Sequence, residues 1–452
     1  MANEQGKLGT LECVMILVGG MVGSAVFSLS GLTYAMAGPS TIVSWIIGGL
    51  ILLLYGLETA ELCSIYPESG GIFVFPHEAL GKTRLGKEAW GWGAAWSLLN
   101  VNIFGAAFSA IYVATYLGQS FPALAEHQVL LAVIWCVVCG LLCLFNITVA
   151  GKVNLVMVLV LIALMLLYFF LGVGSGGFTG ENFVPFFTRG SLGGTGFISA
   201  IPVAMLAYGA IVSVAFMVGQ VKNPKKTVPN SMITAMIIAI VMYCLVIVAT
   251  IGLLAVEVFN APDTAWIQYV PLYAVAWFAL SAIPWLHYVI SIAAVLALTT
   301  TLLVLLMTAG WTVQAAAAKG LLPKGLAKVS GKTGTPVAAM IICAVATLAV
   351  SCFPGFVEQI TNCGAICNAI CVIIISITLV AARKKTTPQP GNFRLAGGAF
   401  FPILVSILVV IFILPGIFQQ WSYWGWALGW YVLGAIIFAL CQIGKGKGEK
   451  VQ

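Results

Sequence analysis

The chain has 452 residues, of which 61% are hydrophobic and only 7% are charged, and its formal net charge is +7. Soluble domains usually contain about 25% charged residues, so this composition excludes a soluble protein and places most of the chain in a lipid bilayer. The positive charge does not indicate nucleic-acid binding, because the basic residues fall almost entirely in alternate loops.

Apolar segments of about 20 residues predict an all-α membrane protein with twelve transmembrane helices, because that length crosses the hydrocarbon core. The predicted spans are 10–37, 40–66, 89–119, 127–147, 151–174, 195–221, 227–256, 271–316, 335–353, 357–382, 397–416 and 421–442. The eighth is too long for one crossing, and we expect its C-terminal part to continue beyond the bilayer. No linker divides the chain, which predicts a single transmembrane domain over residues 1–452.

The distribution of basic residues predicts the orientation. With the N-terminus inside, 19 of the 20 Lys and Arg residues lie in cytoplasmic segments, and only Arg189 lies in an outer loop. Residues 1–10 do not resemble a cleaved signal peptide. The sequence therefore predicts a multi-pass protein of the cytoplasmic membrane with both termini inside.

Gly19–Ser24 interrupts the first span near its middle. Unsatisfied backbone is tolerated at that depth only where protein or a watery cavity covers it. A broken helix offers free N–H groups and a dipole end that suit a carboxylate, as in secondary transporters. We therefore expect Gly23, Ser24 and Ala25 to hold the anionic end of a small solute. The alternative is that these small residues only allow close helix packing.

Four motifs follow one another along the chain with a spacing known from one family. Gly19–Phe27 matches G-x-x-(I/V)-G-S-(G/A)-(I/V)-F, and Tyr66–Gly71 matches a YP-x-(S/A)-GG turn. Val221–Pro229 contains the Asn-Pro loop, and Gly320–Pro336 contains a Gly-Leu-Leu-Pro and Gly-Thr-Pro pair. Together these motifs resemble those of amino acid–polyamine–organocation (APC) permeases over nearly the whole chain.

The resemblance implies a five-plus-five inverted repeat, which is also found in sodium-coupled leucine transporters. The first repeat would span about 10–174 and the second about 195–382, and two helices within 397–442 would be appended. The first and sixth helices would both be broken at the midplane. Gly209, inside the sixth span, fits the second break.

The resemblance also implies how an amino acid would be held. The Ser24 hydroxyl and the amides of Gly23 and Ala25 would bind its carboxylate. The acceptors for its ammonium would be main-chain carbonyls at Met21, Leu206, Ala207 and Gly209. Tyr208 would act as a gate over the solute or, alternatively, as a packing aromatic.

Selectivity depends on the neighbours of these elements. Trp96, Asn100 and Asn102 are candidate pocket residues, or alternatively form interhelical hydrogen bonds. The middle of spans 1, 3, 6, 8 and 10 contains no acidic residue, and Val212 stands where many relatives have Glu or Asp. Because a buried cation needs a partner, this favours a neutral amino acid, although aromatic stacking leaves a cationic substrate open.

The fifth span reads Val-Leu-Val-Leu at 158–161, where proton-coupled members of the family, and several exchangers, carry a lysine. We therefore favour exchange (antiport) of amino acids by alternating access. The alternatives are an H⁺- or Na⁺-coupled symporter and an amino acid/amine antiporter. Thr299 and Thr300 in the eighth span are a candidate Na⁺ site, although such hydroxyls usually bond to their own helix.

Other residues with ionisable or reactive side chains give weaker indications of function. Glu58 and Glu61 lie on one helical face, where pairing with a cation is favoured over a gate or proton role. Two cysteine stripes, at 136–143 and 363–371, predict packing rather than metal binding. The sequence contains no convergent acid, histidine or nucleophile arrangement, so it predicts no enzyme, cofactor or metal site, and its partners would be a small solute and the lipid bilayer.

Overall fold

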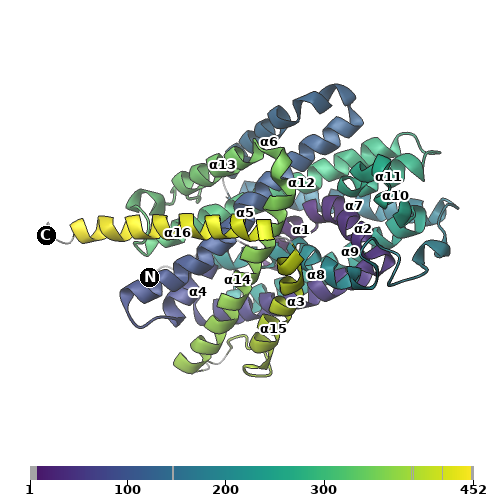
Figure 1. Ribbon diagram of the computed structural model, residues 1–452. Coiled ribbons are helices and arrows are strands. Elements are labelled where there is room, and N and C mark those ends of the chain that lie inside the picture. Colours follow the sequence, from purple (N-terminus) through teal and green to yellow (C-terminus); the bar gives the residue numbers. More distant parts are fainter. Residues whose placement is uncertain (1–7, 145–146, 388, 390, 420, 449–452) are drawn as a thin grey trace.

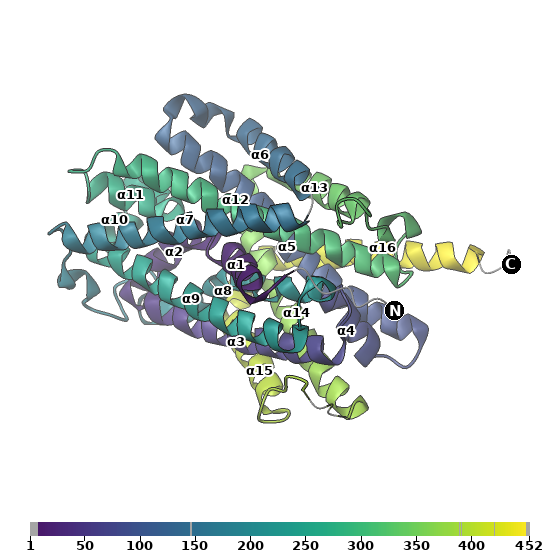
Figure 2. The ribbon, with the colours of Figure 1, turned by 180° about the vertical axis from the view of Figure 1, so that it is seen from behind.

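The computed structural model describes residues 8–144, 147–387, 389, 391–419 and 421–448. Lys7 and Lys450, which contribute to the predicted orientation, lie outside these residues. Within the described range the chain is helical and has no strand, apart from an isolated bridge between Leu8 and Val221. Figures 1 and 2 show the helices gathered in one bundle, with α16 extending from it toward the C-terminus.

The principal helices, with the short 3-10 segments η5 and η6, are α1 Thr10–Met21, α2 Ser24–Ala37, α3 Thr41–Ile65, α4 Gly71–Ala79, α5 Arg84–Ser120, α6 Gln128–Cys143, α7 Ile147–Gly174, α8 Gly196–Ala207, η5 Gly209–Gln220, α9 Pro224–Leu253, α10 Val256–Asn260, η6 Pro262–Tyr269, α11 Pro271–Phe278, α12 Leu286–Ala318, α13 Val337–Ser351, α14 Val357–Lys385, α15 Phe400–Gln419 and α16 Trp421–Gly448. Among the described residues, nine segments are long and apolar enough to cross a membrane, and 10–21, 337–351 and 400–412 form shorter apolar helices. The chain is thus an all-α multi-span membrane protein, while the count of twelve crossings and the inverted repeat stay predictions.

The predicted eighth span, 271–316, was wrong as one continuous helix. Residues 271–278 form the separate helix α11, and α12 begins only at Leu286 and continues to Ala318. Pro284 lies in the connection between them. Proline lacks the N–H that a helix interior requires and clashes with the preceding turn, so the chain forms two separate helices here.

The first span is divided into α1 and α2 by Val22 and Gly23, which have non-helical backbone angles. A Cβ on Gly23 would lie 1.6 Å from Thr301 Oγ1 and 2.5 Å from the Ala297 carbonyl oxygen, both on α12. Only glycine fits there, which explains why α12 can approach the break so closely.

The sixth span is divided in a similar way. α8 ends at Ala207, Tyr208 has non-helical angles, and the chain continues as the 3-10 segment η5. α1 packs against α7, α9, α12 and η5, while α2 packs against α8. Figure 2 shows α1 and α2 within the bundle between these helices. Both interruptions therefore lie in the protein interior, where protein groups instead of lipid surround the exposed backbone.

Candidate functional site

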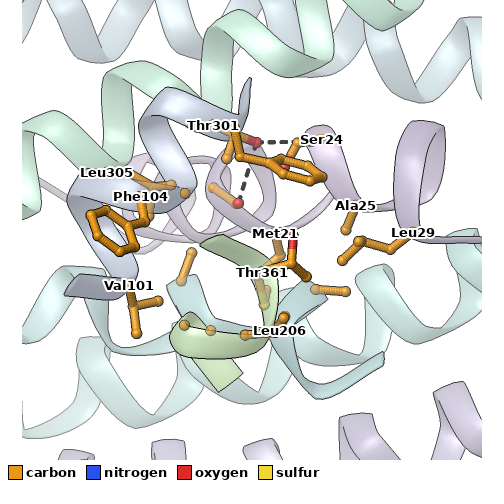
Figure 3. A pocket seen from close by; sticks show the side chains of 17 residues that line it. Met21, Ser24, Ala25, Leu29, Val101, Phe104, Leu206, Thr301, Leu305 and Thr361 are labelled. Carbon is orange, nitrogen blue, oxygen red and sulfur yellow. Dashed lines mark hydrogen bonds between the residues drawn. The ribbon is translucent and has the colours of Figure 1, made fainter. Parts of the chain in front are cut away.

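A cavity of about 80 Å³ lies between the two interruptions, with walls from α1, α2, α5, α8, η5, α12 and α14. Figure 3 shows Met21, Ser24 and Ala25 on one side of it and Leu206 facing them. Among the described residues that line it, only three side chains are polar, the hydroxyls of Ser24, Thr301 and Thr361, and none is charged. Because the space exceeds that of a single water, the cavity can hold a small, largely uncharged group.

Thr301 of α12 occupies the break in the first span. The Ser24 amide donates to Thr301 Oγ1 at 3.1 Å, and the same oxygen lies 3.4 Å from the carbonyl oxygens of Gly19 and Gly20 (Figure 3). Thr300 Oγ1 donates to the Gly19 carbonyl at 3.1 Å. Two neighbouring hydroxyls thus provide partners for backbone groups that the interruption leaves outside the helix.

Tyr243 of α9 joins the two interruptions. Its hydroxyl is directed at the carbonyl oxygen of Met21, the last residue of α1, and lies 3.2 Å from the carbonyl oxygen of Ala207, the last residue of α8. The side chain is fully buried. Tyr243 is not among the site residues predicted from the sequence, although a tyrosine in the middle of an apolar span needs a partner for its hydroxyl.

Most of the predicted binding residues line the cavity; those that do so are Met21, Ser24, Ala25, Leu206, Ala207 and Gly209. Gly23 lies behind the wall, against Thr301. Tyr208 is fully buried outside it, donates to the Trp45 carbonyl at 3.0 Å, and packs on Trp45 and Tyr243. In this conformation Tyr208 is a packing aromatic, the alternative that the sequence left open.

The three candidate pocket residues of the third span are not brought into the cavity wall. Trp96 stacks on Trp430 of α16 with ring centroids 4.5 Å apart, and its indole donates to the Trp430 carbonyl. Asn100 Nδ2 lies 3.5 Å from Cys363 Sγ, and Asn102 is buried. The face of α5 that reaches the cavity is instead formed by residues 101, 104, 105 and 108, which share one side at helical spacing.

The candidate ion site is not assembled from Thr299 and Thr300. Thr299 Oγ1 accepts the Trp135 indole N–H at 2.8 Å and donates to the Val295 carbonyl at 2.6 Å, so it turns toward α6. Thr300 and the neighbouring Thr301 face the break instead. Among the described residues no group of three or more His, Cys, Asp or Glu side chains could hold a metal ion.

A larger cavity of about 780 Å³ adjoins the central one. Its walls come from the second half of α2, the end of α5, the start of α8, η6 and the first turns of α14. Leu29, Phe108 and Thr361 line both cavities. The central cavity is therefore approached from the side of the molecule at which α2 ends.

The opposite side of the molecule is closed by contacts between distant segments. The Leu8 amide donates to the Gln220 carbonyl at 2.9 Å, and the Gly70 amide donates to the Phe216 carbonyl at 3.2 Å. Lys319 Nζ, directly after α12, lies 2.9 Å from a carboxylate oxygen of Glu68 and 2.9 Å from one of Glu78. These contacts join the start of α1, the α3–α4 turn, the end of η5 and the end of α12.

A bundle of apolar helices around an uncharged cavity, reached from one side and closed on the other, defines a membrane transporter of small molecules. Comparison with known proteins agrees: residues 8–441 match the model of the amino acid permease family, and the chain belongs to this family within the APC superfamily. It is thus a transporter and not an enzyme, and its family transports amino acids.

Individual relatives are distant but cover almost the whole chain. The chain is 25% identical to the branched-chain amino acid permease BcaP of Bacillus subtilis over 96% of this chain and 92% of the relative. It is 22% identical to BcaP of Lactococcus lactis, over 95% and 93%, and 26% identical to the aspartate-proton symporter of Bacillus subtilis, over 97% and 84%.

Proposed function

We propose that the protein exchanges neutral, aliphatic amino acids across the cytoplasmic membrane by alternating access. The observation that carries this proposal is the uncharged cavity between the two helix interruptions. Main-chain groups and the Ser24 hydroxyl at the breaks would hold the ammonium and carboxylate of a zwitterion. Leu206, Leu305 and Phe104 would surround its side chain. Two relatives that match almost the whole chain are named branched-chain amino acid permeases, which supports the same substrate class.

The binding roles follow from the positions of the cavity-lining groups. Ser24 N–H already has a partner in Thr301, so the Ser24 hydroxyl and the Ala25 amide are the donors for the carboxylate. The carbonyls of Met21 and Ala207 accept from Tyr243, and each keeps a second lone pair for the ammonium.

Exchange without a coupling ion is supported by two contacts of the first break. Val158 and Asn154 of α7 lie against Gly19, and Asn154 Nδ2 donates to the Met15 carbonyl at 3.0 Å. At this contact α7 thus presents an amide and an aliphatic side chain to α1. Thr300 and Thr301 already donate to the carbonyls of the break, which fills positions that Na⁺ would take.

Alternating access is supported by the asymmetry of the two sides. The larger cavity opens from the side where α2 ends, and the contacts of Leu8, Gly70 and Lys319 close the other. With the predicted orientation, this is an outward-facing conformation. Transport would then require those contacts to open while the larger cavity closes around the solute.

The test uses purified protein in liposomes loaded with leucine or left empty. We expect labelled leucine to enter loaded vesicles, saturably, and to enter empty vesicles little, with or without Na⁺ or H⁺ gradients. Accumulation in empty vesicles under an ion gradient would overturn exchange. A thermal-shift screen against amino acids and their amines identifies the substrate, because a ligand that binds the native state raises its stability.

A further inference from the structure

Glu58 is a fully buried carboxyl group on the apolar helix α3. Its Oε2 lies 2.7 Å from Ser376 Oγ on α14, and its Oε1 has no hydrogen-bond partner among the described residues. It is separate from the walls of both cavities. Neither the family match nor the proposed substrate site accounts for it.

The cation nearest to Glu58 is committed to another carboxylate. Arg383 of α14 donates through Nε to Glu61 Oε1 at 2.7 Å and through Nη2 to Glu61 Oε2. Its remaining bonds go to the carbonyls of Gly398 and Leu395, and the Leu395 amide also donates to Glu61. Glu61 therefore has a complete ion pair, and one guanidinium cannot neutralise a second carboxylate.

Among the described residues no second cation acts on Glu58, since Lys384 and Lys385, beside Arg383 in the last turn of α14, are exposed. Besides Arg383 and Glu61, its only electrostatic neighbour among the described residues is Tyr55, whose hydroxyl lies 3.6 Å from Cys371 Sγ. α8, η5 and α15, which also pack against α3, contain no titratable residue.

The remaining titratable groups on elements that contact α3 are engaged or lie at helix ends. On α4, His77 and Glu78 bind each other, and Glu78 binds Lys319. On α2, Tyr34 donates to the Leu254 carbonyl. On α9, Tyr243 bonds at the breaks, Cys244 is half-buried, and the lysines, at 225 and 226, stand in the first turn.

We propose that Glu58 is a proton-binding site and that the bound proton holds α3 against α14. An ionised carboxylate buried without a cation is costly, whereas a neutral carboxylic acid is not. The proton comes from bulk water, forms the O–H bond of the acid, and returns to water when the site opens. With the proton on Oε2, the acid donates to Ser376 Oγ across the same short contact.

The proton regulates the transport cycle and does not drive it. Glu58 and its neighbour Glu61 both join α3 to α14, and α3 also packs against α8 and η5, which flank the second helix break. Loss of the proton leaves a buried charge at the α3–α14 contact, so alkaline pH weakens the packing beside the transport site. This inference rests on the proposed function only for its transport readout.

The direct test is infrared spectroscopy of the full-length protein in liposomes. We expect a carbonyl stretch of a protonated carboxylic acid that is absent in Glu58→Gln and unchanged in Glu257→Gln, which alters an exposed carboxylate. In Ser376→Ala the band should move to higher frequency, because its hydrogen bond is lost. The proposal is overturned if the wild-type protein lacks this band or if the band remains in Glu58→Gln. If Glu58→Gln does not fold, the Ser376→Ala variant tests the proposal instead, and an unshifted band in that variant contradicts it.

The transport test compares leucine exchange across alkaline pH. Wild-type exchange should fall by up to about tenfold per pH unit once the proton is lost, as for a single titrating group. Glu58→Gln, which mimics the neutral acid, should show a flat profile, and Glu257→Gln should follow the wild type. An unchanged pH profile in Glu58→Gln contradicts the proposal. Failure of leucine to stabilise even the wild type would contradict the substrate assignment instead, and the infrared result would still stand.

Discussion

The Tyr243 hydroxyl hydrogen-bonds the carbonyl oxygen of Met21, where α1 ends, and also lies 3.2 Å from the carbonyl oxygen of Ala207, where α8 ends. One side chain from α9 thus connects both interruptions of the bundle. Because a hydroxyl has a single proton, it is shared between the two carbonyls or alternates between them. We therefore expect the spacing of the two breaks, and so the width of the central cavity, to depend on this residue.

Tyr243→Phe removes this hydroxyl and keeps the ring. We expect a loss of about 1–3 kcal/mol of stability, because two buried carbonyls lose a donor, together with weaker leucine binding. Thermal unfolding with and without leucine measures both effects. Tyr168→Phe is the control, because its buried hydroxyl bonds to Thr250, away from the breaks. Equal leucine-induced shifts in wild type and Tyr243→Phe would show that the hydroxyl does not shape the binding site.

Gly23→Ala tests the close approach of α12 to the first break. Its Cβ would lie 1.6 Å from Thr301 Oγ1 and 2.5 Å from a backbone carbonyl oxygen, so α1–α2 and α12 must separate. We expect loss of leucine binding and a clear fall in the melting temperature. Gly93→Ala, on α5 and outside the cavity wall, is the matched control, because a Cβ there meets only Ile374 Cδ1, at 4.0 Å. If the two variants behaved alike, the contact with Thr301 would not matter.

The sequence predicted the two helix interruptions better than the side chains that pack against them. Glycines inside apolar spans located the interruptions at residues 22–23 and 208, because a break in a membrane helix is a local property. Thr301 contacts the Ser24 amide across 277 residues of chain, and Tyr243 reaches Met21 across 222. Such pairings depend on which helices become neighbours, and no local pattern contains that information.

The same limit explains the misplaced residues. Trp96, Asn100 and Asn102 are polar or aromatic residues of the span that lines the cavity, but the rotation of α5 turns residues 101, 104, 105 and 108 to it instead. Glu61 does pair with a cation, as favoured, but the partner is Arg383 in the last turn of α14. Pairing within a helix bundle follows from packing, which the spacing of residues in one helix does not specify.

Ser24→Phe would place a ring in the cavity beside the proposed carboxylate site. We expect it to abolish leucine binding while the protein remains folded, because Ser24 is only partly buried at the cavity wall. Ser24→Ala should bind more weakly, since it loses one donor but keeps the amides. Thermal shift with leucine, together with size-exclusion profiles, measures binding and folding separately. Full binding by Ser24→Phe would refute the site assignment.

Val101→Trp tests whether the cavity selects by side-chain size. Val101 lines the cavity, so a larger ring would displace part of an aliphatic substrate side chain. Loss of that burial, worth about 1.5–3 kcal/mol, should weaken leucine binding roughly 10- to 100-fold and alanine binding much less. Val138→Trp, on the exposed face of α6, is the control. Parallel losses for leucine and alanine would indicate general distortion of the site instead of size selection.

Acid should loosen the closed side of the molecule through Glu78. Burial favours the neutral form, but the hydrogen bonds from Lys319 and His77 outweigh it and hold the pKa of Glu78 below its usual value of 4.5. A carboxyl group whose pKa is lowered on folding adds stability above its unfolded pKa, and this stability is lost as the pH falls through the folded value.

Because Glu78 is partly exposed, the effect of this carboxyl group on stability is modest. We therefore expect Glu78→Gln to unfold at a lower temperature than wild type at neutral pH, and the two to converge once the pH falls below the lowered pKa of Glu78, where the carboxyl group is protonated. A difference between the two melting temperatures that persists unchanged in acid would show that the Lys319–Glu78 contact does not contribute through its charge.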